Sequence, residues 1–208
     1  MYLLKDIESE IQFRLLLKNE SLEAMLKKLE IDLSDNKYLD QDMVMDFAIK
    51  VAEFNFDHVG LSSDDYLKHP INVGRLIASY ADNIDESYVY LALVHNLIEV
   101  GGKVNQKQLS IISPDIIKDI EILTVDRSKQ WDWDYKDVYY KNIQSSDRAS
   151  CIKIFDKLDN IFLIQQNKDK EIRKKYMYEI EEFLMPMAKK RVPNLVDYIN
   201  KLTIYCKD

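Results

Sequence analysis

Glycine and proline are scarce in this chain, and their scarcity limits the folds that it can adopt. The 208 residues include four glycines and four prolines. A β-rich architecture depends on these residues at its many tight turns, so the composition disfavours sheets. No segment has the alternating pattern of a convincing strand, whereas apolar residues recur at spacings of three and four, as in helices. The sequence therefore predicts an all-α fold.

The ends of several expected helices are marked by residues that favour helix starts. Ser21 and Asp85 are expected to cap helices, and Ser113 precedes a proline at a first helical position. Pro186 is expected to kink the helix that contains it. Helices are expected at residues 3–18, 22–30, 40–58, 70–81, 86–100, 105–112, 114–123, 147–165, 171–189 and 194–206, with a partly helical, aromatic-rich segment at 126–144.

The charge and composition of the chain restrict its partners. A formal net charge of −7 argues against general binding to nucleic acid or to an anionic membrane. No apolar run approaches the ~18 residues of a membrane span, and the N-terminus lacks the pattern of a signal peptide. Cys151 and Cys206 lie in apolar helical patterns and are expected to be buried free thiols in a reducing compartment, such as the cytoplasm.

Three polar residues interrupt the apolar stretch 91–100. In a continuous helix His95 and Glu99 stand one turn apart on one face, with Asn96 beside them. Burying a polar group without a partner costs about 1–3 kcal/mol, so these residues are expected to have partners.

The two other histidines lie earlier in the chain. His69 precedes Pro70, which favours the first position of a helix, so His69 is expected at a helix entrance. The positive end of the helix dipole there favours a neutral imidazole that can bind a metal. His58 is expected to close the helix 40–58, either as a residue that contacts a ligand or as a packed core histidine.

The helix 147–165 is apolar around most of its circumference but carries one narrow polar stripe. Such a stripe on a central helix is either the wall of a polar site or a sliver of solvated surface. Its members fall at i, i+3, i+4 and i+7, namely Lys153, Asp156, Lys157 and Asn160.

Two histidines and a carboxylate suit a divalent first-row metal ion. We expect His69, His95 and Asp156 to hold such an ion. Glu99 is then placed to orient or deprotonate a water molecule, and the lysines of the polar stripe can balance phosphate charge.

Three motifs in this order resemble the HD-domain metal-dependent phosphohydrolases, and most closely the RelA/SpoT hydrolase branch. The resemblance covers roughly residues 43–205 and implies an all-α domain that removes the 3′-pyrophosphate from guanosine tetra- or pentaphosphate. The motifs are Tyr66-Leu67-Lys68-His69-Pro70, Ala92-Leu93-Val94-His95-Asn96-Leu97-Ile98-Glu99 and Ile152-Lys153-Ile154-Phe155-Asp156-Lys157-Leu158-Asp159-Asn160.

The resemblance also implies roles for individual residues. Metal ligands fall on His69, His95, Asp156 and the Asn96 position, the catalytic glutamate on Glu99, and a nucleotide-pocket residue on Asn160. Two positions depart from the family pattern. The aspartate that names the HD motif is Asn96 here, a neutral and weaker donor, and the acid after the glutamate is Val100. The segment between His58 and His69 also carries acidic residues where the family has basic ones.

Three functions remain open from the sequence, and one of them is a structural oligomerisation module. The first is a metal-dependent phosphohydrolase, with Mn²⁺ favoured over Fe²⁺ or Zn²⁺, that acts on (p)ppGpp, another nucleotide or another phosphorylated small molecule. The second is an inactive HD domain that binds a nucleotide or protein in a regulatory role. We expect residues 1–38 to form a helical extension of an HD-domain-like unit at 39–208, and a homo-oligomer stays open.

Overall fold

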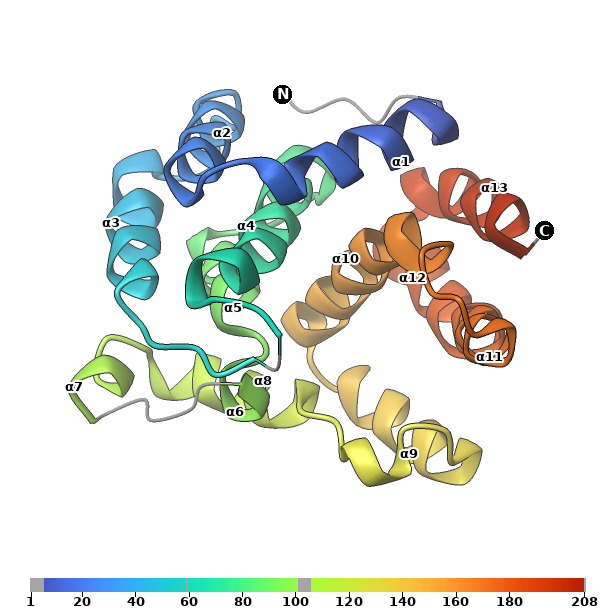
Figure 1. Ribbon diagram of the computed structural model, residues 1–208. Helices are drawn as coiled ribbons and strands as arrows, with labels where there is room; N and C mark the ends of the chain where they lie inside the picture. Colours follow the sequence, from blue (N-terminus) through green and yellow to red (C-terminus); the bar gives the residue numbers. More distant parts are fainter. Residues whose placement is uncertain (1–5, 59, 101–105, 208) are drawn as a thin grey trace.

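The computed structural model describes residues 6–58, 60–100 and 106–207, and within these ranges it contains helices and loops but no strand (Figure 1). The predicted all-α class is therefore confirmed. The α-helices are α1 (Ile7–Leu16), α2 (Leu22–Ser34), α3 (Gln41–Ala52), α4 (Ser63–Tyr80), α5 (Glu86–Val94), α6 (Leu97–Val100), α7 (Gln106–Leu109), α8 (Pro114–Leu123), α9 (Trp133–Ile143), α10 (Asp147–Ile164), α11 (Lys170–Glu179), α12 (Met185–Arg191) and α13 (Val196–Lys207).

Two helices of 18 residues, α4 and α10, form the centre of the molecule and pack against each other (Figure 1). Helices α2 and α5 flank α4, while α1, α5, α8, α12 and α13 surround α10. Phe155 and Leu158 of α10 are fully buried, and burying such a side chain contributes about 1.5–3 kcal/mol. The polar stripe of α10 thus lies on a helix that is otherwise held inside the core.

Side-chain caps begin the helices where the sequence predicted them. Ser21 accepts a hydrogen bond from the backbone N–H of Ala24, and Asp85 accepts one from Ser87. Ser113 caps α8, whose first residue is Pro114. Each cap satisfies an N–H group that has no partner inside its helix.

The predicted helix 40–58 ends early, at Ala52. The chain then turns back toward α4, because the Ser63 hydroxyl donates to the carbonyl of Phe54 and accepts from the N–H of Phe56. Both phenylalanines are buried from this loop. Phe54 continues the helical spacing of Phe47 and Val51, so the apolar pattern extends beyond the end of the helix. His58 therefore lies in a loop and does not close a helix.

The helix predicted to begin at Pro70 begins at Ser63 instead. Ser62 is its cap and accepts from the N–H of Asp65, and acidic residues in this first turn suit the positive end of the helix. Pro70 lies in the helix interior, where a proline costs about 3 kcal/mol that dense packing around α4 offsets. His69 is therefore in the body of α4, and its predicted position at a helix entrance is wrong.

The predicted helix 171–189 is interrupted by a wide π-type turn over Ile180–Leu184, and Pro186 follows at the start of α12. A wider turn before a proline accommodates the missing N–H and is one of the known causes of a kink. Gly101 and Gly102, which follow the expected helix 86–100 and would favour its end, lie outside the described residues. No helix in the described part of the chain combines the length and apolar character that crossing a membrane would require.

The N-terminal segment packs directly on the two central helices. Helix α1 lies against α10, and α2 lies against α4 and α3. A boundary near residue 38 therefore stays a prediction.

Candidate metal centre

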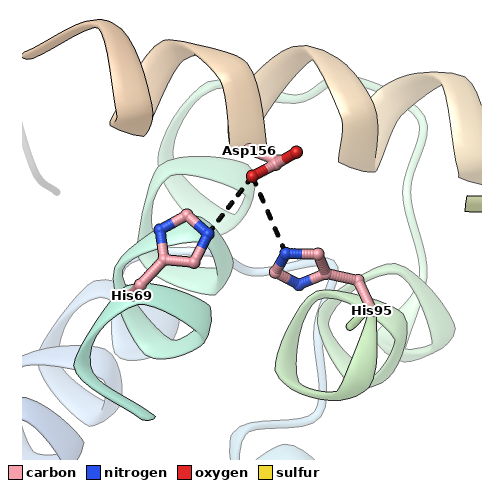
Figure 2. Close-up of side chains that lie close together, drawn as sticks. All are labelled: His69, His95 and Asp156. Carbon is pink, nitrogen blue, oxygen red and sulfur yellow. Dashed lines mark hydrogen bonds and ion pairs between the residues drawn. The ribbon is translucent and has the colours of Figure 1, made fainter. Parts of the chain in front are cut away.

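Three side chains from three different helical segments meet between α4, α10 and the end of α5. Figure 2 shows the rings of His69 and His95 directed at the carboxylate of Asp156. Ligand atoms of the three residues all lie within 4.8 Å of one another. The structure thus brings together the two histidines and the aspartate that the sequence selected.

His95 is buried and lies at the point where α5 ends. Its Nδ1–H donates to the carbonyl of Ala92 over 2.6 Å, a carbonyl that an unbroken helix would give to the N–H of Asn96. In the neutral ring this hydrogen bond leaves Nε2 as an acceptor, 3.8 Å from Oδ1 of Asp156. Nε2 is buried and has no hydrogen-bond partner among the described residues.

The helix break at His95 and Asn96 corrects the expectation of one continuous helix over 86–100. Helix α6 begins afresh at Leu97, so His95 and Glu99 do not stand one turn apart on a single helix. The ring of His95 occupies the carbonyl of Ala92, which would otherwise accept from the next turn of the helix. The helix therefore ends here although the apolar periodicity continues.

His69 is held from behind by Asp159. Its Nδ1 donates to Oδ2 of Asp159 over 2.6 Å, and its Nε2 lies 3.2 Å from Oδ1 of Asp156. Burial lowers the pKa of His69, but the hydrogen bonds to the two aspartates outweigh burial and raise that pKa to about 9. The raised pKa contradicts the predicted preference for a neutral ring, and a cation at Nε2 would replace a proton.

Asp156 is buried and ionised. Burial opposes ionisation, but the charge of Lys153 and the hydrogen bond from His69 hold the pKa of Asp156 well below its usual range. Its Oδ2 accepts from the Lys153 ammonium over 2.9 Å, and its Oδ1 accepts from the Asn160 amide over 2.7 Å. The carboxylate is thus fixed in place with Oδ1 facing both imidazoles.

Glu99 and Asn96 line the cavity beside the centre. Oε1 of Glu99 accepts from the backbone N–H of Val125 over 3.1 Å, and Oε2 accepts from Nε of Arg127 over 2.8 Å. The Asn96 side chain shares a hydrogen bond with the hydroxyl of Tyr66. Both predicted residues therefore lie near the histidines but also have partners within the protein.

The cavity has a volume of about 680 Å³, which falls within the ~300–1,000 Å³ of small-molecule sites. The four predicted substrate-binding residues, His58, Lys153, Lys157 and Asn160, all line it. His58 is exposed and stacks on Tyr66, with ring centroids 5.6 Å apart.

Several residues that shape the site could not be identified from the sequence. Asp159 lies in the third motif, where the sequence assigned it no role. No feature of the neighbouring residues identifies it as the partner of His69, 90 positions earlier. The segment between His58 and His69 lacks the basic residues of the family, but cationic side chains from elsewhere in the chain line the same cavity. They are Arg14, Lys18, Arg127 and Lys136.

The donor set fits a divalent transition metal. Two imidazole nitrogens and a carboxylate oxygen are ligands of zinc, iron and manganese, and the orphaned Nε2 of His95 is the atom that such an ion would satisfy. Asp159 behind His69 and the Ala92 carbonyl behind His95 are the outer hydrogen-bond partners that metal-binding histidines usually have.

Comparison with known proteins finds a curated sequence relative and solved structures with a similar fold. No family model matches the chain. The chain is 31% identical over 103 residues to guanosine-3′,5′-bis(diphosphate) 3′-pyrophosphohydrolase MESH1 of Drosophila melanogaster, a match that covers 49% of this chain and 57% of that protein. It therefore spans somewhat more than half the length of this relative.

One of the solved structures is that of a metazoan ortholog of SpoT described as hydrolysing ppGpp. The two structures superpose with a TM-score of 0.58 at 23% identity, over 79% of this chain and 93% of the other. This likeness establishes the helical fold. The chain is thus similar in sequence to MESH1 over 103 residues and shares the helical fold of this SpoT ortholog.

Proposed function

We propose that this chain is a metal-dependent phosphohydrolase that acts on a nucleotide such as (p)ppGpp. The observation that carries the proposal is the buried Nε2 of His95, which faces Oδ1 of Asp156 with no hydrogen-bond partner among the described residues. A buried acceptor without a partner costs about 1–3 kcal/mol, and a cation bound there would remove that cost. The MESH1 relative, named as a 3′-pyrophosphohydrolase of this nucleotide, supports the substrate class.

In this proposal His69, His95 and Asp156 hold the metal, and the amide oxygen of Asn96 adds a neutral ligand. Mn²⁺ is the ion we favour, with Fe²⁺ and Zn²⁺ as alternatives that the same donors accept. When bound, a divalent ion polarises a phosphoryl oxygen and lowers the pKa of a bound water.

Glu99 is the general base in this proposal. The N–H of Val125 and the guanidinium of Arg127 hold its carboxylate at the edge of the cavity. From there it can take the proton of an attacking water, a contribution of about 10²–10⁴-fold to a rate.

The cationic side chains of the cavity would bind the phosphate groups. Lys153 and Lys157 lie on α10, and Arg127, in the short 3₁₀ helix Arg127–Lys129 before α9, lines the same cavity. Lys153 also forms an ion pair with Asp156, and Lys157 forms one with Glu179. A bound phosphate would therefore interact with lysines whose charge is partly balanced by the protein. Asn160, one turn beyond Asp156, and His58 complete the proposed nucleotide pocket.

The ion pair between Glu99 and Arg127 favours a second candidate function. Nη2 of Arg127 lies 2.5 Å from Oε2 of Glu99, and the neighbouring position that the family fills with an acid is Val100. A glutamate held by an arginine, without a second acid, suits a protein that binds the nucleotide in a regulatory role and does not hydrolyse it.

Location and assembly belong to the proposal as well. Cys151 and Cys206 are both buried and free, which fits a reducing compartment, and we propose a cytoplasmic location. Association with a second copy stays open.

A hydrolysis assay with (p)ppGpp and added Mn²⁺ separates the two functions. Hydrolysis would release pyrophosphate and leave the nucleoside 5′-diphosphate end intact, and Asp156→Ala would abolish it. Equilibrium binding of the nucleotide without pyrophosphate release would favour the regulatory function. Neither binding nor release would contradict both.

A further inference from the structure

An arginine from the N-terminal helix reaches the metal centre from behind. Arg14 lies near the end of α1 and is 3% exposed. Its Nε donates to Oδ1 of Asp159 over 2.5 Å, and its Nη2 donates to Oδ2 over 2.7 Å. This two-pronged contact spans 145 positions of sequence and joins α1 to the central helix α10.

The same carboxylate accepts two further hydrogen bonds. The amide of Asn72 donates to Oδ1 over 2.6 Å, and Nδ1 of His69 donates to Oδ2 over 2.6 Å. Asp159 is 0% exposed, so no solvent group supports it. Its four donors match the acceptor capacity of a carboxylate, and two of them come from a single guanidinium.

The rigid fork of the guanidinium fixes the plane of the Asp159 carboxylate. That plane sets the direction in which Oδ2 meets the ring of His69. Without the fork the carboxylate can turn about its Cβ–Cγ bond, and His69 loses its fixed partner.

We propose that Arg14 is a positioning residue for His69, acting through Asp159, and that the N-terminal helix is a working part of the metal centre. This inference rests on the proposed function, because it takes His69 as a metal ligand. It reassigns the N-terminal segment, which the sequence suggested was an accessory extension.

The docking of the segment supports this role. Leu17 is almost completely buried, and the carbonyl of Lys18 accepts from the ammonium of Lys68 over 2.8 Å. Lys68 directly precedes His69. The N-terminal segment therefore supports His69 in two ways. Arg14 reaches its imidazole through Asp159, and the backbone of Lys18 binds the side chain of the preceding residue, Lys68.

The test compares Arg14→Met and Arg14→Lys with Arg148→Met. Arg148 is a matched control on α10, since its Nε donates to Asp119 over 2.5 Å, away from the cavity. Two quantities are measured: the affinity for Co²⁺, read from its visible absorption, and the proton resonance of Nδ1–H of His69 in metal-free protein. The resonance is assigned by its loss in His69→Gln.

The proposal predicts that Arg14→Met weakens Co²⁺ binding at least ~10-fold, as expected when an outer partner of a metal ligand is removed, and broadens or abolishes the Nδ1–H signal. Arg148→Met should keep the affinity within about twofold. Wild-type affinity and an unchanged signal in Arg14→Met would overturn the proposal.

Two further outcomes keep the inference separate from the proposed function. If the wild-type chain takes up no Co²⁺, the proposed function fails, and the Nδ1–H signal alone then decides the role of Arg14. If Arg14→Met does not fold, Arg14→Lys decides in the same two measurements, because it keeps the charge and loses the two-pronged contact.

Discussion

Nε2 of His95 faces Oδ1 of Asp156 at 3.8 Å, deep between α5 and α10. The opposite nitrogen of the ring donates to the Ala92 carbonyl, so in the neutral ring the two facing atoms are both acceptors. Acceptors aimed at each other in a buried space call for a cation or a proton between them. His69 approaches the same carboxylate oxygen from α4, with its Nε2 3.2 Å away.

Asn96 is the residue at which the site departs most from the family motif. Asn96→Asp is expected to raise the affinity for Mn²⁺ and the rate of hydrolysis, each by about tenfold, because a charged oxygen binds a hard cation more strongly than an amide. Titration of the metal and a turnover assay measure the two effects. Asn142→Asp adds the same charge on an exposed part of α9 and is the control. No change in either quantity would count against a contact between Asn96 and the metal.

Glu99 is proposed to act on water without binding the metal itself. Glu99→Gln is therefore expected to lower kcat by at least ~10²-fold while the metal content stays at the wild-type level. Glu121→Gln, on the exposed face of α8, controls for the loss of a carboxylate. A loss of metal together with activity would show that the role of Glu99 is different.

Glu179 makes the stability of the fold depend on pH. Burial raises the pKa of Glu179, but Lys157 and Lys136 outweigh burial and lower that pKa to about 2, from 4.5. Between these two values the unfolded chain binds the proton more readily than the folded one. The stabilisation, about 3 kcal/mol, is therefore complete above pH 4.5 and is lost as pH falls toward 2.

Urea unfolding of Glu179→Gln tests this dependence. The variant should be destabilised at pH 7, because two buried lysines lose their carboxylate partner, and its stability should fall less steeply than that of the wild type below pH 4.5. Glu171→Gln removes an exposed pair with Lys174 and should follow the wild-type curve. Parallel curves for Glu179→Gln and the wild type would contradict the assignment.

The helical fold and the three candidate ligands could be predicted from the sequence, because each rests on a local signal. Apolar spacing and caps such as Ser21 and Ser113 depend on a few adjacent residues. His69, His95 and Asp156 stood in recognisable motifs, and the structure places them together. Their roles as ligands remain a proposal.

The parts that could not be predicted depend on distant contacts. Pro70 favoured a helix start at that residue, but packing of neighbouring helices against α4 stabilises a helix that continues past the proline. The break after Val94 depends on the ring of His95, which donates a hydrogen bond to the carbonyl of Ala92 three residues earlier. The contact of Arg14 with Asp159 joins residues 145 positions apart, and no periodicity within either helix predicts it.

The most direct test of the account is elemental analysis of protein purified without chelator, alongside His69→Ala and Asp156→Ala. We expect about one transition-metal ion per chain in the wild type and loss of that ion in both variants. A wild-type protein without metal, which also takes up none from excess Mn²⁺, would contradict the metal centre and with it the proposed hydrolase.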